Sequence, residues 1–205
     1  MPAAGKFVSI VRVACVPPGK GKPMGLPLQT MSVADFLTWE AQQPTRHEFF
    51  RGEVFAMTGG SARHNRVILN LAARLSEHLD GTSCQVFAES MKVRLADEAV
   101  LYPDVMVSCG SALAGDEQVV TDPTLIIEVL SPSTMGYDKR NKFILYRGLP
   151  TLREYALIDP ASREIEVFTL TADGWLLTDQ TTAAELTLAS IECRLPMAAV
   201  FKGVA

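Results

Sequence analysis

Two acidic residues in the middle of the chain lie within or beside apolar segments, where burying a charged carboxylate costs free energy. Glu128 lies inside the apolar run 124–130, Thr-Leu-Ile-Ile-Glu-Val-Leu, and Asp104 follows Pro103 at the start of a second apolar stretch. A buried ionised carboxylate is costly unless it is paired or binds a cation. Taken singly, Glu128 is also explained by a solvated strand face or by a salt bridge to a core arginine. Asp104 alone is also explained by a turn.

Together, the two acids predict a site for one hard cation. Mg²⁺ prefers oxygen ligands and usually takes one or two carboxylates, with water and substrate phosphate completing its shell. With a basic group beside the pair, the metal can activate water while the cation stabilises the charge that develops during phosphodiester cleavage. The pattern for such a site is Pro-Asp, a gap and then Glu-x-Lys, but Leu130 stands where the lysine should be. The sequence therefore predicts that the positive charge comes from another segment.

A lysine fourteen residues beyond the buried glutamate is the first candidate for that charge. Asp138, Lys142 and Tyr146 recur at intervals of four and share one face of a helix expected over Tyr137–Arg147. We expect Asp138 to keep the Lys142 ammonium protonated. The alternative is a surface ion pair worth a few tenths of a kcal/mol. Lys92, on a strand earlier in the chain, is the second candidate.

Composition restricts the class of protein. The chain has 205 residues, 48% of them apolar, and a net charge of −4, which excludes a nucleic-acid binder held by a broadly basic surface. Contact with phosphate must be local or mediated by metal. The four cysteines form no CxxC pair, so we expect no zinc cluster and predict buried free thiols in a reducing cytoplasm. No apolar run approaches the roughly 18 residues typical of a membrane span.

The chain divides into two parts. Residues 1–29, rich in Gly, Pro and Lys toward their end, are predicted to form an irregular N-terminal arm, and residues 30–205 one domain. Helical spacing of apolar residues predicts a helix over Ala62–Leu79, and Ser32 is a suitable cap for a shorter helix before Pro44. The expected strands are a pair within His47–Thr58, then Gln85–Ala88, Met91–Leu95, Asp104–Ser108, Thr124–Leu130, Tyr155–Asp159, Glu164–Leu170 and Trp175–Asp179. This order predicts an α+β or mixed α/β layered fold.

Several of these segments, from about Met31 to the C-terminus, resemble the Uma-two family of proposed bacterial endonucleases, within the PD-(D/E)XK restriction-endonuclease-like superfamily. The most specific match is Glu-Val-Leu-Ser-Pro-Ser-Thr at 128–134, followed by Asp138, Lys142 and Tyr146. The other matches are Arg46-His47-Glu48-Phe49 with Gly52-Glu53, His64, Pro103-Asp104, and Glu154-Tyr155 with Asp159-Pro160. Ala156 stands where the family commonly has Trp.

The resemblance implies a restriction-endonuclease-like core, a central mixed β-sheet flanked by helices. It implies that Asp104 and Glu128 bind the metal and that Lys142 replaces the missing strand lysine. Glu53 is either a further carboxylate near the metal or a solvated hairpin residue. His64 either contacts substrate phosphate or shuttles a proton, or is a helix-capping or exposed residue. The residues expected to contact substrate are His64, Ser131, Asp138 and Tyr146.

The resulting hypothesis is an endonuclease that hydrolyses DNA phosphodiester bonds with Mg²⁺, for which Mn²⁺ can substitute. The alternative is a catalytically idle nuclease-fold protein that binds nucleic acid or a protein partner. A third hypothesis is a metal-dependent hydrolase of a smaller phosphorylated substrate. Double-strand cleavage by one small site needs two copies, which predicts a homodimer. We also expect the Asp104 and Glu128 carboxylates to approach within roughly 4–7 Å of each other.

Overall fold

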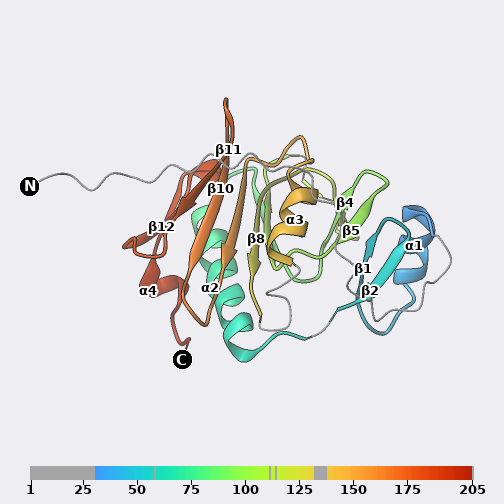
Figure 1. The fold of residues 1–205 in the computed structure, drawn as a ribbon, viewed down its shortest axis with the longest axis horizontal. Coiled ribbons are helices and arrows are strands. Elements are labelled where there is room, and N and C mark those ends of the chain that lie inside the picture. The colour runs from blue at the N-terminus through green and yellow to red at the C-terminus, as the bar shows by residue number, and fades with distance from the viewer. Residues whose placement is uncertain (1–30, 58, 111, 114, 132–137, 205) are drawn as a thin grey trace, which may run out of the picture.

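The computed structural model describes residues 31–57, 59–110, 112–113, 115–131 and 138–204 (Figure 1). The arm predicted for residues 1–29 lies outside these ranges, as does Cys15. Within the described ranges, no helix is long and apolar enough to cross a membrane.

A six-stranded mixed sheet forms the centre of the molecule, with strand order β11-β10-β9-β8-β6-β3. Its central strand β8 is parallel to β9 and antiparallel to β6, and the remaining neighbours are antiparallel. The strands are β3 (Gln85–Ala88), β6 (Val105–Ser108), β8 (Pro123–Val129), β9 (Glu154–Ile158), β10 (Ile165–Thr171) and β11 (Gly174–Asp179).

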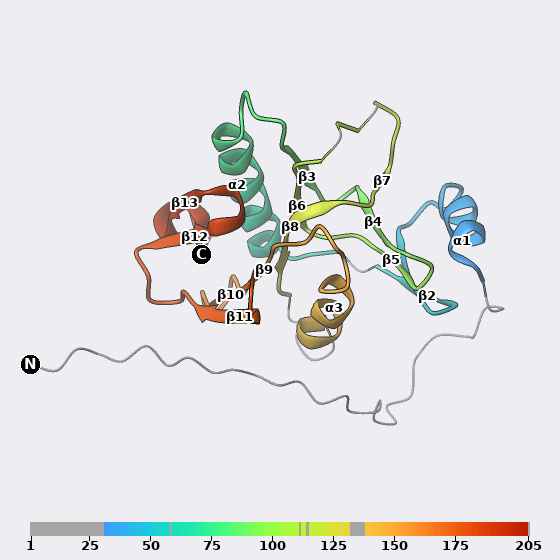
Figure 2. The same ribbon diagram turned by 90° about the horizontal axis from the view of Figure 1, so that it is seen from above.

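Helices cover both faces of β8 (Figure 2). Successive side chains of a strand point to opposite faces, and Leu125, Ile127 and Val129 share one buried cluster with the apolar side of α2 (Ala62–His78). Ile126 and Leu130 share another with α3 (Asp138–Tyr146). The alternation therefore directs Glu128 toward α3.

A smaller five-stranded sheet, of order β2-β1-β5-β4-β7, carries the N-terminal part of the domain. It packs against α1 (Val33–Glu40), which is capped by the Ser32 side chain as the sequence predicts. Arg51 and Gly52 join β1 to β2, both with positive φ, the geometry of a tight hairpin turn. The strands are β1 (His47–Phe50), β2 (Glu53–Ala56), β4 (Lys92–Leu95), β5 (Ala99–Leu101) and β7 (Val119–Val120).

The C-terminal elements pack on the α2 side of the central sheet (Figure 1). They are β12 (Glu185–Leu188), the single-turn η1 (Ala189–Ile191), β13 (Cys193–Pro196) and α4 (Met197–Val200). Mixed sheets flanked by helices confirm the predicted fold class. The sequence pattern missed β5, β7, β12, β13 and α4, which are all short.

The prediction of free thiols is wrong for one pair of cysteines. Cys84 and Cys109 form a disulfide, whereas Cys193 is free and buried. Gln85 of β3 lies opposite Ser108 of β6. Cys84 directly precedes Gln85, and Cys109 directly follows Ser108. Strand register brings the two cysteines together, and no spacing in the sequence shows that register.

Candidate active site

Glu128 lies near the end of β8 and is nearly buried, with a relative exposure of 7%. Its Oε1 accepts a hydrogen bond of 3.0 Å from the hydroxyl of Tyr146 and lies 3.5 Å from Nζ of Lys142. Both partners come from α3, one helical turn apart. The spacing that predicted a shared helix face therefore corresponds to shared contact with one carboxylate.

Asp104 immediately precedes β6, the antiparallel neighbour of β8. The last registered pair is Val105 with Ile127, so Asp104 comes opposite Glu128 where the two strands separate. Its Oδ2 accepts a hydrogen bond of 2.7 Å from the main-chain N–H of Val129. Both predicted acids thus lie at the same end of two adjacent strands.

His64, in the first turn of α2, contacts the second acid. Its Nε2 lies 3.3 Å from Oδ1 of Asp104, so the two oxygens of this carboxylate are held from different directions. Burial lowers the pKa of His64, but the hydrogen bond to Asp104 and the charge of that carboxylate outweigh burial and leave the pKa raised. A raised pKa favours the protonated, cationic imidazole beside Asp104.

The electrostatics of Glu128 are unusual for a carboxylic acid. Burial raises its pKa to about 8; the ammonium of Lys142 opposes this rise, and the charges of Asp104 and Glu48 add to it. A cation bound between the acids would compensate the charges that burial and repulsion disfavour. Strongly shifted pKa values are common at functional sites.

A third carboxylate, Glu48 of β1, completes the cluster. Nζ of Lys142 donates a hydrogen bond of 2.9 Å to Oε1 of Glu48, and the same oxygen accepts one of 3.2 Å from the main-chain N–H of Tyr102. Lys142 therefore bridges Glu48 and Glu128. Glu48 lies in the matched segment Arg46-His47-Glu48-Phe49, but nothing in the sequence assigned it a role.

The structure does not bring Glu53, the predicted third acid, into contact with the others. Glu53 is exposed on β2, the edge strand of the smaller sheet, opposite Phe50. Glu48 lies on β1, the next strand inward, beside β5 and the segment that leads to Asp104. The order of strands, which the sequence does not reveal, decides which of these two acids enters the site.

The remaining predicted residues have different surroundings. Ser131 is buried directly after β8, and Asp138 is the first residue of α3, with a side chain outside the described part. Tyr146 is fully buried and donates to Glu128, so it supports a site carboxylate rather than facing solvent. Nζ of Lys92 donates to Gln118 and lies over the ring of Tyr102, and no described contact joins Lys92 to Glu128.

The carboxylates of this site fit Mg²⁺ better than they fit a metal ion that takes all of its ligands from protein side chains. The described residues contain no group of three His, Cys, Asp or Glu side chains arranged to hold a metal ion. Mg²⁺ needs fewer, because one or two carboxylates suffice when water and substrate phosphate supply the other ligands. Asp104 and Glu128, both oxygen donors at the ends of adjacent strands, are the residues that would hold it.

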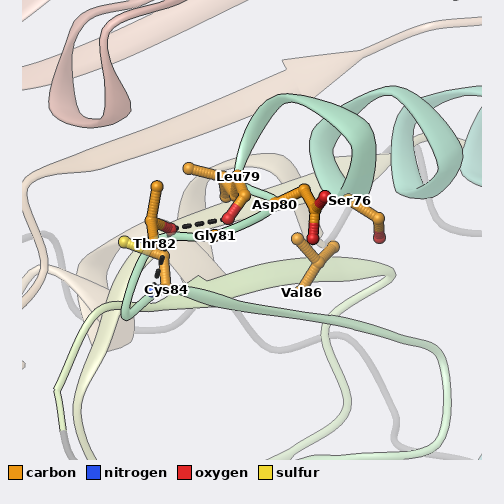
Figure 3. Close-up of a pocket in the computed structure, with 7 residues that line it drawn as sticks. All are labelled: Ser76, Leu79, Asp80, Gly81, Thr82, Cys84 and Val86. Carbon is orange, nitrogen blue, oxygen red and sulfur yellow. Dashed lines mark hydrogen bonds between the residues drawn. The ribbon is translucent and has the colours of Figure 1, made fainter.

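A separate hollow lies at the far end of α2 (Figure 3). It has a volume of about 220 Å³ and is lined by Ser76, Leu79, Asp80, Gly81, Thr82, Cys84 and Val86. Thr82 donates to the carbonyl of Leu79 and accepts from the N–H of Cys84. None of the predicted site residues lines this hollow. The hydroxyl of Thr82 is already hydrogen-bonded within the turn that follows α2.

Comparison with solved structures identifies the fold. A solved structure from Anabaena variabilis, described as "a putative nuclease belonging to DUF820", superimposes with a TM-score of 0.67 at 17% identity, covering 85% of this chain and 99% of that one. At this identity the likeness shows a shared fold. The chain therefore has the same fold as that protein, and in this chain two acids lie at the ends of adjacent central strands.

The family follows from the sequence comparisons. The model of the Uma2 family, described as "Putative restriction endonuclease", matches residues 33–198, and the chain belongs to this family. Two uncharacterized proteins of Synechocystis sp. are 34% and 38% identical to it. The first match covers 87% of this chain and 95% of the relative, and the second covers 73% and 86%.

Proposed function

We propose that this protein is a DNA endonuclease that hydrolyses phosphodiester bonds with Mg²⁺, for which Mn²⁺ can substitute. The observation that carries the proposal is the position of Lys142, whose amino group contacts both Glu48 and Glu128. The phosphodiester-cleaving pattern requires a cation beside its two acids. Leu130 occupies the usual slot and is buried in the apolar cluster under α3. Lys142 supplies the missing charge from that helix.

Each residue of the cluster has a part in this proposal. Asp104 and Glu128 hold the metal, which when bound lowers the pKa of water and neutralises phosphate charge. Lys142 stabilises negative charge that develops on the phosphate, because a preorganised cation in a water-poor site interacts strongly with such charge. His64 and Tyr146 hold the two metal-binding carboxylates in place.

The oligomeric state and location are part of the same proposal. A site that cuts one strand must act twice to cut a duplex, so we expect a homodimer. A DNA substrate places the protein in the bacterial cytoplasm.

Cleavage of supercoiled plasmid tests the proposed function. The wild-type protein with Mg²⁺ should convert plasmid to nicked and linear forms, and excess EDTA should stop the reaction. Lack of cleavage together with Mg²⁺ binding to the same sample would favour a smaller phosphorylated substrate, assayed with nucleotides and phosphodiester dyes. Lack of both cleavage and Mg²⁺ binding would favour the idle, partner-binding alternative.

A further inference from the structure

We propose that Glu40 and Tyr102 are positioning residues that fix the carboxylate of Glu48, and through it the amino group of Lys142. This inference rests on the proposed function and extends it to residues outside the acid cluster. Neither Glu40 nor Tyr102 has a described contact with Asp104 or Glu128 side chains. Their effect on the reaction would pass through Glu48.

Tyr102 links two carboxylates by different groups. Its main-chain N–H donates to Oε1 of Glu48 at 3.2 Å, and its hydroxyl donates to Oε1 of Glu40 at 2.9 Å. The residue is only 4% exposed. Because the ring is anchored at its far end, the N–H that meets Glu48 is held at a fixed place.

Glu40, the last residue of α1, holds the backbone on both sides of this contact. Its side chain is 3% exposed and accepts the Tyr102 hydroxyl and, at 2.8 Å, the N–H of His47. Nδ1 of His47 lies 3.0 Å from the other oxygen of Glu40. Since His47 precedes Glu48 in β1, one buried carboxylate fixes both the strand that carries Glu48 and the residue that donates to it.

This arrangement serves to position Glu48, because stability alone does not require it. A buried charged network is often no more stable than well-packed apolar residues of similar volume. Lys92, also buried, belongs to the same region, with Nζ 5.4 Å from the centre of the Tyr102 ring. A displacement of about 1 Å at a reacting group can cost about 10²-fold in rate, so fixing Glu48 and Lys142 has a measurable consequence.

Tyr102→Phe and Glu40→Gln test the inference by single-turnover plasmid cleavage. The first removes only the hydroxyl, and the second keeps the shape of the side chain but removes its charge. We expect the cleavage rate constant to fall about ten-fold in each variant, as a small displacement of the amino group of Lys142 predicts. DNA affinity, measured with Ca²⁺ in place of Mg²⁺, should stay within about two-fold, because neither residue is placed against substrate.

A Glu48→Ala background distinguishes positioning from general loss of structure. If Tyr102 acts through Glu48, Tyr102→Phe should have no further effect once Glu48 is removed, because coupled residues are not additive. The same fall in both backgrounds would overturn the inference. Glu154→Gln is the matched control: Glu154 is a buried glutamate whose described partners are Thr169, Ala189 and Ser190, and its replacement should leave the rate constant unchanged.

Amide hydrogen exchange supplies a readout that does not depend on activity. Tyr102→Phe and Glu48→Ala should each accelerate exchange at the amide of residue 102, while that of Val107, at the centre of the sheet between β3 and β8, stays unchanged. Unchanged exchange at residue 102 would overturn the inference. If the wild-type protein cleaves no DNA, the proposed function fails, and exchange at residue 102 still decides whether Glu40 and Tyr102 hold Glu48.

Discussion

The amino group of Lys142 lies 3.5 Å from Oε1 of Glu128, although one residue belongs to a helix and the other to a strand. β8 ends at Val129, and α3 packs on the face of the sheet toward which Glu128 points. Position 130 is where the Glu-x-Lys pattern has its lysine, but Leu130 occupies that position and is buried in the apolar cluster under α3. A lysine there would have its charged group in this cluster. The helix therefore delivers to Glu128 a charge that its own strand does not carry.

Lys142→Ala should reduce DNA cleavage by about 10²–10³-fold, the range typical of losing one group that stabilises transition-state charge. Mg²⁺ affinity should change little, because an ammonium is not a metal ligand. Single-turnover cleavage and Mg²⁺ titration of the same sample measure the two effects. Lys202→Ala, which removes an exposed lysine after α4, is the control. Cleavage at the wild-type rate would leave the surface-pair explanation, and Lys92 would be the next residue to test.

Asp104→Ala should abolish both cleavage and Mg²⁺ binding. Asp104→Asn separates the loss of charge from the loss of structure, because an amide oxygen can still accept the hydrogen bond from Val129. We expect Asp104→Asn to melt close to the wild-type temperature and yet lose cleavage. Normal cleavage by this variant would remove Asp104 from the proposed metal site. Asp159→Asn, at a buried aspartate in a turn, is the matched control.

The pKa of Glu128, raised to about 8 by burial, predicts how stability depends on pH. Between its ordinary value of 4.5 and about 8, the folded protein holds a proton that the unfolded chain has released. The contribution of Glu128 to the stability of the metal-free protein therefore falls as pH rises through this range.

Glu128→Gln should remove that dependence and raise the melting temperature of the metal-free protein more at about pH 9 than at about pH 5. Thermal melts in EDTA measure it, with Glu154→Gln as the control at another buried glutamate. Equal changes in melting temperature at the two pH values would contradict the raised pKa of Glu128.

The sequence predicted the parts of the fold and site that depend on local pattern. Intervals of four correctly placed Lys142 and Tyr146 on one helix face, and an acid inside an apolar strand marked Glu128. Glu53, one of whose two predicted roles was a further carboxylate near the metal, lies on the edge strand β2, whereas Glu48 joins the cluster because its strand β1 pairs with β5. The Cys84–Cys109 pairing depends on register in the same way. Contacts between distant segments leave no periodic signal in a single sequence.

Removal of residues 1–30, leaving a chain that starts at Met31, should change the melting temperature by only a few degrees. The segment is rich in Gly and Pro toward its end and has no apolar periodicity, so we expect it to add little to the core. Differential scanning calorimetry of the full and shortened chains measures the difference. A large loss of stability would assign the apolar segment Phe7–Val16 to the fold.

Calorimetric titration of Mg²⁺, repeated with Mn²⁺, decides whether Asp104 and Glu128 jointly hold a metal ion, which the proposed chemistry requires. The wild-type protein should bind one ion per chain, and the binding should be saturable. Binding should be lost in Glu128→Ala and retained in Glu154→Gln. Absence of binding in the wild-type protein, or the same affinity in Glu128→Ala, would contradict the proposed metal site.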